Sequence, residues 1–368
     1  MNTNLPISNR LSSLDFLKGM TMILLALEGT LLYEHLRPVI HGTWAAHILI
    51  QFFHHPWNGL HFWDLVQPTF MFVAGIAMAF SMKKFRLTHS WGQSFIKILI
   101  RCGWLFFWGV LDYAVRGNRL SFELWDVLTQ LSFTTLVAFL IMDWSVPAQL
   151  IVSGLCLLIP ELLYRYLHVP GFDQPFVDQH NFGNYVDLIL MNKINPDGWV
   201  AINCISTSAH TIWGVLAGKL LLSDKTSSQK MRWLVITGLI FLGLGFGLDW
   251  SHITPIIKRI ATSSFVLASG GYCLLFLSVC YWWIDIKKHR NYLLFFNLFA
   301  LNSIFIYLFN EIVGDRWFTG YILTLTNGIF GFIQIPSIFA AILGSLVVFA
   351  LETGLLYFLY RRKIFFRL

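Results

Sequence analysis

The sequence contains few charged residues. Lys, Arg, Asp and Glu make up 12% of its 368 residues, against about 25% in a typical soluble domain. This shortage excludes an ordinary soluble protein. The formal net charge of +7 does not indicate a nucleic-acid partner, because cytoplasmic loops of membrane proteins carry an excess of Lys and Arg. We expect no binding of nucleic acid.

Cysteine is also scarce, and the five cysteines show neither a CxxC pair nor a metal-ligand spacing. They fall within apolar runs, where free cysteine behaves as a small packing residue. The close histidine spacings of zinc sites, such as HExxH, are absent. We therefore expect no resident metal.

Long apolar runs dominate the chain, which is 56% hydrophobic. Runs of roughly 20 residues are long enough to cross about 30 Å of hydrocarbon as helices, and they are too long for the strands of a membrane barrel. The sequence thus predicts an all-α polytopic membrane protein, with 1–368 forming one transmembrane domain. The ten expected spans are 15–34, 64–82, 94–114, 123–142, 146–167, 199–222, 232–250, 261–284, 291–311 and 334–360.

The distribution of basic residues predicts the orientation. With the N-terminus inside, most of the 26 Lys and Arg residues fall on the cytoplasmic side, as the positive-inside rule requires. Both termini are then cytoplasmic, in a bacterial inner membrane, and the segment before 64–82 is extracytoplasmic. The segment 168–198 is expected to be an extramembrane loop. No internal repeat or inverted pair of broken helices is apparent, and 334–360 is a candidate homodimer face.

One polar segment interrupts the apolar runs: "FHHPWNGLHFWD", residues 53–64. Pro56 favours an extended conformation for His55, and the residues after it suggest a turn. Asp64 is expected to be the N-cap of the next helix, whose positive end then lies beside the imidazoles. A histidine that titrates near neutrality beside oriented N–H donors suits general-base catalysis on an acyl group.

Several polar residues lie within or beside the expected spans, where charge is costly and often functional. Glu28 lies in the first span, as either a snorkelling carboxylate or a functional one. Lys258 and Arg259 form a basic pair on the outer side, where an anion or a carboxylate such as Glu28 is a plausible partner. Asn302 lies mid-span, as a helix–helix contact or a substrate contact.

Five motifs together resemble the heparan-α-glucosaminide N-acetyltransferase family, whose bacterial relatives are called NagX-like or DUF5009 proteins. The motifs occur in the family's order over roughly 10 to 310. They are "RLSSLDFLKGMTM", "HHPWNGLHFWDLVQPTFMFVAG", "TIWGVLAGKLL", "ITPIIKRIATSSF" and "ALNSIFIYL".

The resemblance implies an acetyl group moved from cytosolic acetyl-CoA to the amine of a glucosamine on the far side. It marks His54, three residues before Trp57, as the active histidine, and it leaves His55 as a spacer. His54 either takes the proton from the attacking amine or carries the acetyl group as an acyl-imidazole. The family has an Asn at or near the position of Glu28, and this departure leaves three roles open for Glu28: it orients His54, holds the sugar amine or changes the substrate.

The chain also departs from the family pattern elsewhere. Lys18 replaces an Arg, which keeps the charge but loses the bidentate fork, Gln130 is followed by Leu131 in place of an Arg, and Ala261 replaces a Trp. The expected contacts to the sugar are Trp57, Asn58, Asp64, Lys258, Arg259, Asn302 and Gln130. The expected contacts to acetyl-CoA are Lys18, Lys97 and Arg101.

Two other functions stay open from the sequence. One is O-acylation of a cell-surface glycan, whose ester product mild alkali would cleave. The other is transport of a sugar or a peptidoglycan fragment, which would proceed without acetyl-CoA. The identity of the acceptor and the oligomeric state are not predicted.

Overall fold

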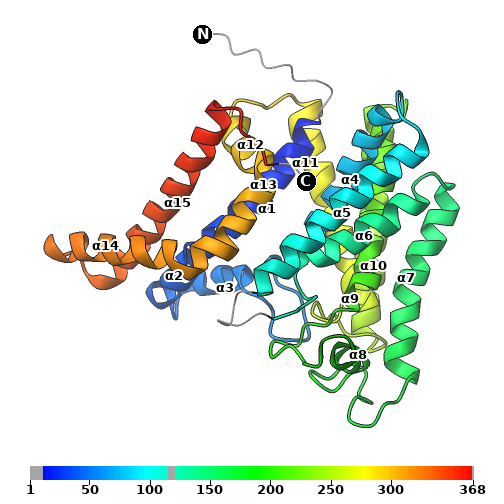
Figure 1. The fold of residues 1–368 in the computed structure, drawn as a ribbon, viewed down its shortest axis with the longest axis horizontal. Coiled ribbons are helices and arrows are strands. Elements are labelled where there is room, and N and C mark those ends of the chain that lie inside the picture. The colour runs from blue at the N-terminus through cyan, green and yellow to red at the C-terminus, as the bar shows by residue number, and fades with distance from the viewer. Residues whose placement is uncertain (1–10, 115–120, 367–368) are drawn as a thin grey trace. The chain divides into compact units, whose positions relative to one another are not determined.

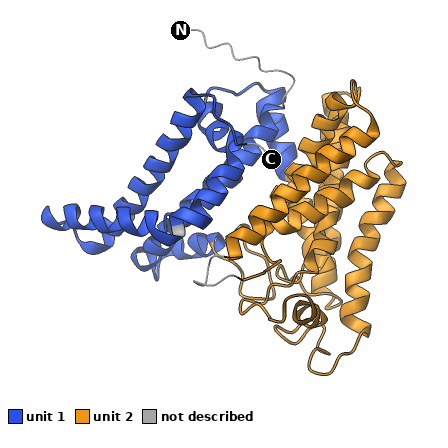
Figure 2. Cartoon of the chain, viewed as in Figure 1, with its two compact units in different colours: residues 1–52, 276–367 blue, residues 53–275, 368 orange. Residues whose placement is uncertain are grey.

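The computed structural model describes residues 11–114 and 121–366, and these form an all-helical fold (Figure 1). Among the described residues the only β-type pairing is an isolated bridge between Asn58 and Ile257. Contacts divide the chain into two compact units, coloured in Figure 2. Of the described residues, unit 1 contains 11–52 and 276–366, and unit 2 contains 53–114 and 121–275.

Unit 1 is built around α1. Its helices are α1 (Ser12–Gly29), α2 (Leu32–Ile40), α3 (Trp44–Leu49), α12 (Leu293–Leu301), α13 (Ser303–Phe309), α14 (Thr319–Phe332) and α15 (Ser337–Arg361), with π-helical segments at Tyr281–Ile286 and Asn310–Phe318. Gly19 lets α1 approach α12 closely, since a Cβ there would lie 2.1 Å from the carbonyl oxygen of Phe296. His35 Nδ1 lies 2.8 Å from Ser345 Oγ and so joins α2 to α15.

Unit 2 is packed around α9, a polar helix with Ser, Thr and His on its buried surface. Its helices are α4 (Val66–Phe85), α5 (Trp91–Ala114), α6 (Val127–Ile141), α7 (Val146–Tyr166), α8 (Phe182–Met191), α9 (Asn203–Leu222) and α10 (Ser227–Trp250); α11 (Ser263–Cys280) includes the boundary with unit 1. Helices α4 and α9 meet at glycine, because a Cβ on Gly75 would lie 2.1 Å from Thr211 O. Small residues allow such backbone contact between membrane helices.

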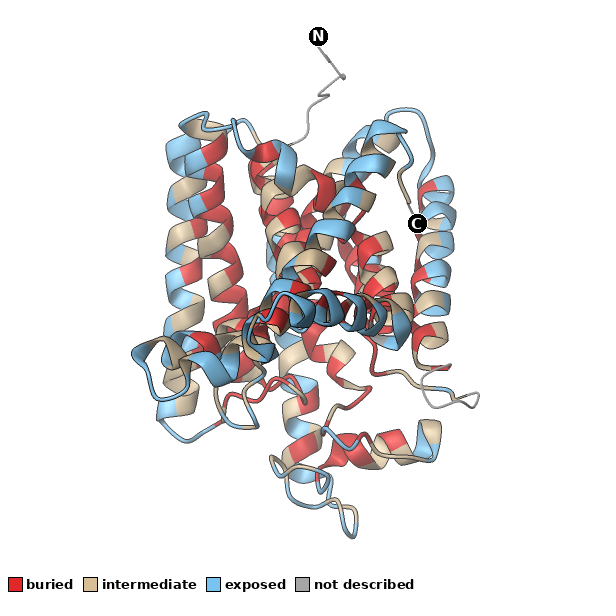
Figure 3. Cartoon of the chain, turned by 90° about the vertical axis from the view of Figure 1, so that its left-hand side faces the viewer, coloured by how far each residue is buried: buried red, intermediate tan, exposed pale blue. Residues whose placement is uncertain are grey.

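The long helices keep apolar faces on the outside. Burial alternates along them in Figure 3, and large apolar side chains on α5, α7 and α10 are exposed, among them Ile100, Ile151 and Ile240. Exposed apolar surface of this extent marks contact with lipid or a partner. Among the described residues, six helices are long and apolar enough to cross a membrane, or up to eight when two bent pairs each count as one span. The fold is that expected of a polytopic membrane protein.

The expected spans differ from the observed helices in several places, and one difference is α14 (Thr319–Phe332), which lies between the expected spans 291–311 and 334–360. The first span breaks between α1 and α2 by 70°, and the span at 291–311 breaks between α12 and α13 by 69°, so broken helices are present where none was expected. The segment 168–198 is not only a loop, because it contains α8, capped by a reciprocal Asn181–Asn184 capping box. The span count of ten and the cytoplasmic termini stay predictions.

Candidate active site

The segment 53–64 is organised by the carboxylate of Asp64. Its Oδ2 accepts hydrogen bonds from the backbone N–H groups of His55 at 3.2 Å and His61 at 2.9 Å. The N-cap of the helical segment that begins at Phe62 is His61, and Asp64 is its third residue. The expectation that Asp64 is the N-cap was therefore wrong. In the reciprocal capping box, the carboxylate of Asp64 accepts from the N–H of the N-cap residue instead.

A second segment, residues 251–264, which runs from the end of α10 into the first turn of α11, lies against the first. The N–H of Gly59 donates to Ile256 O at 2.8 Å, and Asn58 forms its bridge with Ile257. Gly59 has φ of +141°, a conformation that glycine adopts without steric cost. This backbone pairing places His54 and Lys258 in contact across 204 positions of sequence.

His54, Asp64 and Lys258 form the centre of the site. His54 Nδ1 lies 3.0 Å from Asp64 Oδ1 and 3.0 Å from Lys258 Nζ, and Lys258 Nζ lies 3.5 Å from Asp64 Oδ1. The side chains of Asp64 and Lys258 are only 1% and 7% exposed, whereas 38% of the His54 side chain is accessible. The buried pair of Asp64 and Lys258 thus contacts one side of the His54 imidazole, and the ring remains partly exposed to solvent.

The charges around His54 keep its ring neutral. Burial, and then the positive charge of Lys258, lower its pKa from 6.5 to about 4, although Asp64 acts in the opposite direction. Nδ1 lies 3.0 Å from both partners, and it either donates to the carboxylate or accepts from the ammonium. We assign the N–H to Nδ1, donating to Asp64, which leaves the lone pair on Nε2. A neutral imidazole with a free Nε2 is the form that accepts a proton or attacks an acyl carbon.

Trp199 completes this cluster, and sequence reasoning missed it. The His54 ring meets it edge-on, with centroids 5.9 Å apart, and Lys258 Nζ lies 5.3 Å from its ring centre. Gly198, at φ of +80°, turns the chain immediately before it. A Gly–Trp pair after a Pro- and Asn-containing segment was the one available signal, and it is weak.

The other residues expected at the sugar site in unit 2 have structural partners. The indole N–H of Trp57 donates to Phe176 O at 2.7 Å, which favours a scaffold role. The Gln130 side chain bonds with Gln67 at 2.6 Å and with Trp125 O at 3.2 Å. Arg259 is half-buried, and its charge contributes to lowering the pKa of His54.

The residues expected to contact acetyl-CoA lie on two helices, α1 and α5. Lys97 and Arg101 lie one turn apart on α5, where the ammonium of Lys97 is 3.9 Å from the centre of the Phe85 ring. Lys18 lies on α1 of unit 1. Their contact with acetyl-CoA stays a prediction.

Two further expected residues lie in unit 1. Glu28 is an exposed residue near the end of α1, and its role beside His54 stays a prediction. Asn302 lies at the break between α12 and α13, where its amide donates to Ile364 O at 3.2 Å and its oxygen accepts from Phe366 N at 2.9 Å. Those bonds favour the structural interpretation of Asn302.

Asp187 fixes the segment that carries Trp199. Its two oxygens accept from the indole N–H of Trp125 and from the N–H of Ala201, both at 2.9 Å. Burial raises the pKa of this carboxyl from 3.8 to about 7, and the hydrogen bonds only partly oppose that shift. Sequence analysis gave Asp187 no role, because its burial depends on the tertiary position of α8.

The raised pKa of Asp187 predicts a pH-dependent stability. The ionised carboxylate is less favourable in the folded chain than in the unfolded one. The stability that the protonated form contributes is therefore complete below pH 3.8, and it is lost as the pH rises through about 7. Relative to Asp187→Asn, the wild-type melting temperature should therefore fall between about pH 4 and about pH 7. Melting curves in detergent test this, with exposed Asp173→Asn as the control. Parallel curves for wild type and Asp187→Asn would contradict it.

The comparisons place the chain in a family. A family model described as a domain of unknown function, DUF5009, matches residues 10–213. The matched region contains His54, Asp64 and Trp199, whereas Lys258 lies beyond its end. No curated protein matches the chain. Because the match covers more than half of the sequence, the chain belongs to the DUF5009 family.

Proposed function

We propose that this protein is a membrane-bound acetyltransferase that moves an acetyl group from cytosolic acetyl-CoA to the amine of a glucosamine-type sugar on the extracytoplasmic side of the membrane. The observation that carries the proposal is the His54 imidazole, held through Nδ1 by the buried Asp64–Lys258 pair with Nε2 left for chemistry. The order of motifs that resembles the heparan-α-glucosaminide N-acetyltransferase family supports the choice of donor and acceptor.

The proposed reaction needs one base and one oriented acceptor. The amine nitrogen attacks the thioester carbonyl and His54 Nε2 takes the amine proton; the carbon–sulfur bond breaks and the thiolate of CoA leaves with that proton. In the covalent alternative, Nε2 attacks the thioester carbonyl, the carbon–sulfur bond breaks and CoA leaves as the thiolate. The amine then attacks the acetyl carbon, the bond from that carbon to Nε2 breaks, and the proton lost by the amine passes through solvent to the thiolate. Asp64 holds the tautomer in both routes, as the carboxylate of a catalytic triad does.

The proposed arrangement in the membrane follows from the basic-residue distribution. Ten spans with both termini cytoplasmic, in the inner membrane, place the His54 segment on the outer side. Lys18, Lys97 and Arg101 are the proposed contacts to the anionic end of acetyl-CoA, and Glu28 is the proposed partner of the sugar ammonium. The acyl arm of the donor must then reach His54 from the cytoplasmic side.

O-acylation of a surface glycan is the second candidate, and one observation favours it. The ammonium of Lys258 lies 3.0 Å from His54, and a cation there repels a protonated amine but not a neutral hydroxyl group. Under this candidate, the same base activates a sugar hydroxyl, and the product is an ester.

Product linkage tests the proposal. Purified protein in lipid vesicles receives acetyl-CoA labelled in the acetyl group together with a panel of amino sugars and N-acetylated, hydroxyl-bearing glycan fragments. We expect labelled product with the amino sugars, and we expect it to survive mild alkali as an amide. Label that alkali releases would support the ester-forming alternative. Absence of transfer from acetyl-CoA to every acceptor would contradict both.

A further inference from the structure

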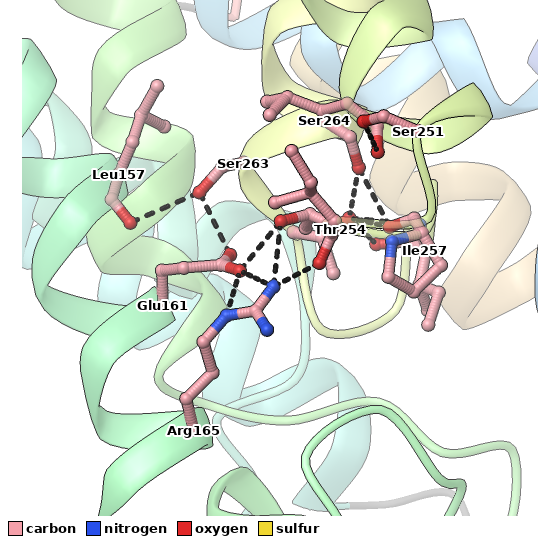
Figure 4. A network of polar contacts seen from close by, with 12 residues as sticks. Leu157, Glu161, Arg165, Ser251, Thr254, Ile257, Ser263 and Ser264 are labelled. Carbon is pink, nitrogen blue, oxygen red and sulfur yellow. Dashed lines mark hydrogen bonds and ion pairs between the residues drawn. The ribbon is translucent and has the colours of Figure 1, made fainter.

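A second polar network lies on the segment that carries Lys258, and the proposed reaction does not use it. Figure 4 shows it between the end of α7 and residues 251–264. Glu161 Oε1 accepts from Arg165 Nε at 2.8 Å and from Thr254 Oγ1 at 2.7 Å, and Glu161 Oε2 accepts from Ser263 Oγ at 3.1 Å. One carboxylate therefore holds a residue on each side of Lys258.

Arg165 strengthens the same attachment. Its Nη2 lies 2.7 Å from Glu161 Oε1, donates to Thr254 Oγ1 at 3.0 Å and bonds to the carbonyl oxygen of Ile253. The guanidinium also lies 4.9 Å from the centre of the Phe176 ring. The side chains of Glu161 and Arg165 are 14% and 30% exposed, so the network is shielded from competing water more than an open surface pair is.

The segment between these attachment points is tightly wound. Thr262 Oγ1 donates to Pro255 O at 2.8 Å and accepts from Ile257 N at 3.0 Å, which closes a loop around Lys258. Ala261 has φ of +49°, a left-handed conformation that costs free energy in any residue with a Cβ. Such a conformation persists only where surrounding contacts hold it, and the Glu161 network supplies contacts at both ends.

We propose that Glu161 is a positioning residue that acts through Thr254 and Ser263 to keep the ammonium of Lys258 beside His54. The inference rests on the proposed function of His54 as the transfer residue. Glu161 touches no reacting group, and its effect passes through the 254–263 backbone to Lys258 Nζ, 3.0 Å from His54 Nδ1. Loss of Glu161 lets the closed loop relax and carries the ammonium away from the ring.

The charge state of His54 supplies a readout that needs no enzymatic activity. Diethyl pyrocarbonate acylates neutral imidazole and not imidazolium, so its rate of reaction at His54 against pH follows the protonation of that ring. Peptide mass spectrometry separates the adduct on His54 from one on His55. Lys258 lowers the pKa of His54. Displacement of the Lys258 ammonium therefore raises the pH at the midpoint of the curve of modification rate against pH.

The experiment compares Glu161→Ala, Glu161→Gln and Lys258→Ala in the full chain. We expect Glu161→Ala and Lys258→Ala to raise the midpoint toward 6.5, which slows modification by up to about tenfold near pH 5.5. Glu161→Gln keeps an acceptor oxygen, so this variant should shift the midpoint less than Glu161→Ala does. In the double variant that combines Glu161→Ala with Lys258→Ala, the midpoint should equal that of Lys258→Ala alone. Glu161→Ala should add no further shift, because Lys258 is the group through which Glu161 acts.

Glu123→Gln is a matched control. Glu123 pairs with Lys193 at 2.6 Å, and the two side chains are 17% and 31% exposed, nearly as Glu161 and Arg165 are. We expect this control to leave the His54 midpoint unchanged.

Thr254→Val removes one hydroxyl at nearly constant volume and replaces Glu161→Ala if that variant does not fold. Wild-type midpoints in the folded Glu161 or Thr254 variants, or an undiminished shift in the double variant, would overturn the proposal. Because the readout is chemical, a protein without acetyltransferase activity can still pass or fail it.

Discussion

Asp64→Asn is expected to reduce acetyl transfer by about 100-fold or more while the protein remains folded. An asparagine side chain keeps the shape but presents an N–H group, so Nδ1 of His54 loses its acceptor or the ring adopts the other tautomer. In serine proteases the same change to the triad carboxylate lowers kcat by about 10⁴. The measurement is the initial rate of acetyl transfer together with the melting temperature of the variant.

Asp64→Ala is expected to be more severe. It leaves two backbone N–H groups without their acceptor and removes the carboxylate beside the buried ammonium of Lys258. Breaking a buried pair in this way costs about 3–5 kcal/mol. We therefore expect a large fall in melting temperature as well as loss of activity.

Asp143→Ala is a suitable control for Asp64→Ala. Asp143 also pairs with a cation, Arg86, but its side chain is 50% exposed, and exposed pairs contribute about 0–1 kcal/mol.

A folded Asp64→Asn protein that transfers acetyl at the wild-type rate would remove Asp64 from the mechanism.

His54→Ala is expected to abolish transfer with little loss of stability. A general base contributes about 10²–10⁴ in rate, and a covalent acetyl carrier contributes the whole reaction. The ring is 38% exposed, and its removal leaves the Asp64–Lys258 pair in place. In this variant the rate of acetyl transfer should therefore fall, while the melting temperature stays close to that of the wild type.

His55→Ala tests whether acetyl transfer requires the imidazole at position 54 in particular or is served by either of the two adjacent histidines. The His55 ring lies over Gly59 and 4.7 Å from the His61 ring centre, and the hydrogen bond from His55 to Asp64 comes from its backbone N–H, which the substitution keeps. We expect this variant to keep activity within a few-fold of wild type. Loss of activity in His55→Ala with retention in His54→Ala would reverse the assignment.

The helical class and the polar segment followed from the sequence because both are local properties. Apolar runs of roughly 20 residues predict helices directly, and the composition of 53–64 marks a turn. The breaks after Gly29 and at Asn302 were missed because long hydropathy windows average over a kink. Leu31 adopts φ of +62° at the first break, and nothing in the local sequence requires that.

The partners of His54 were only half predictable. The sequence, with the family resemblance, pointed to His54, but it placed Asp64 at the wrong cap position. It gave Lys258 an anion or a carboxylate such as Glu28 as its partner, and the carboxylate beside Lys258 is that of Asp64. The actual contact depends on the backbone pairing of Gly59 with Ile256, which is tertiary. Trp199 and Asp187 were missed for the same reason, since their importance depends on which residues the fold brings beside them.

The most direct test of the central claim is CoA release by wild type and His54→Ala, purified in parallel and reconstituted in lipid vesicles with acetyl-CoA and glucosamine. Our account predicts release that requires the amino sugar in the wild type. In His54→Ala it predicts release lower by about 100-fold or more, with an unchanged melting temperature. Equal sugar-dependent release by the two proteins would contradict it.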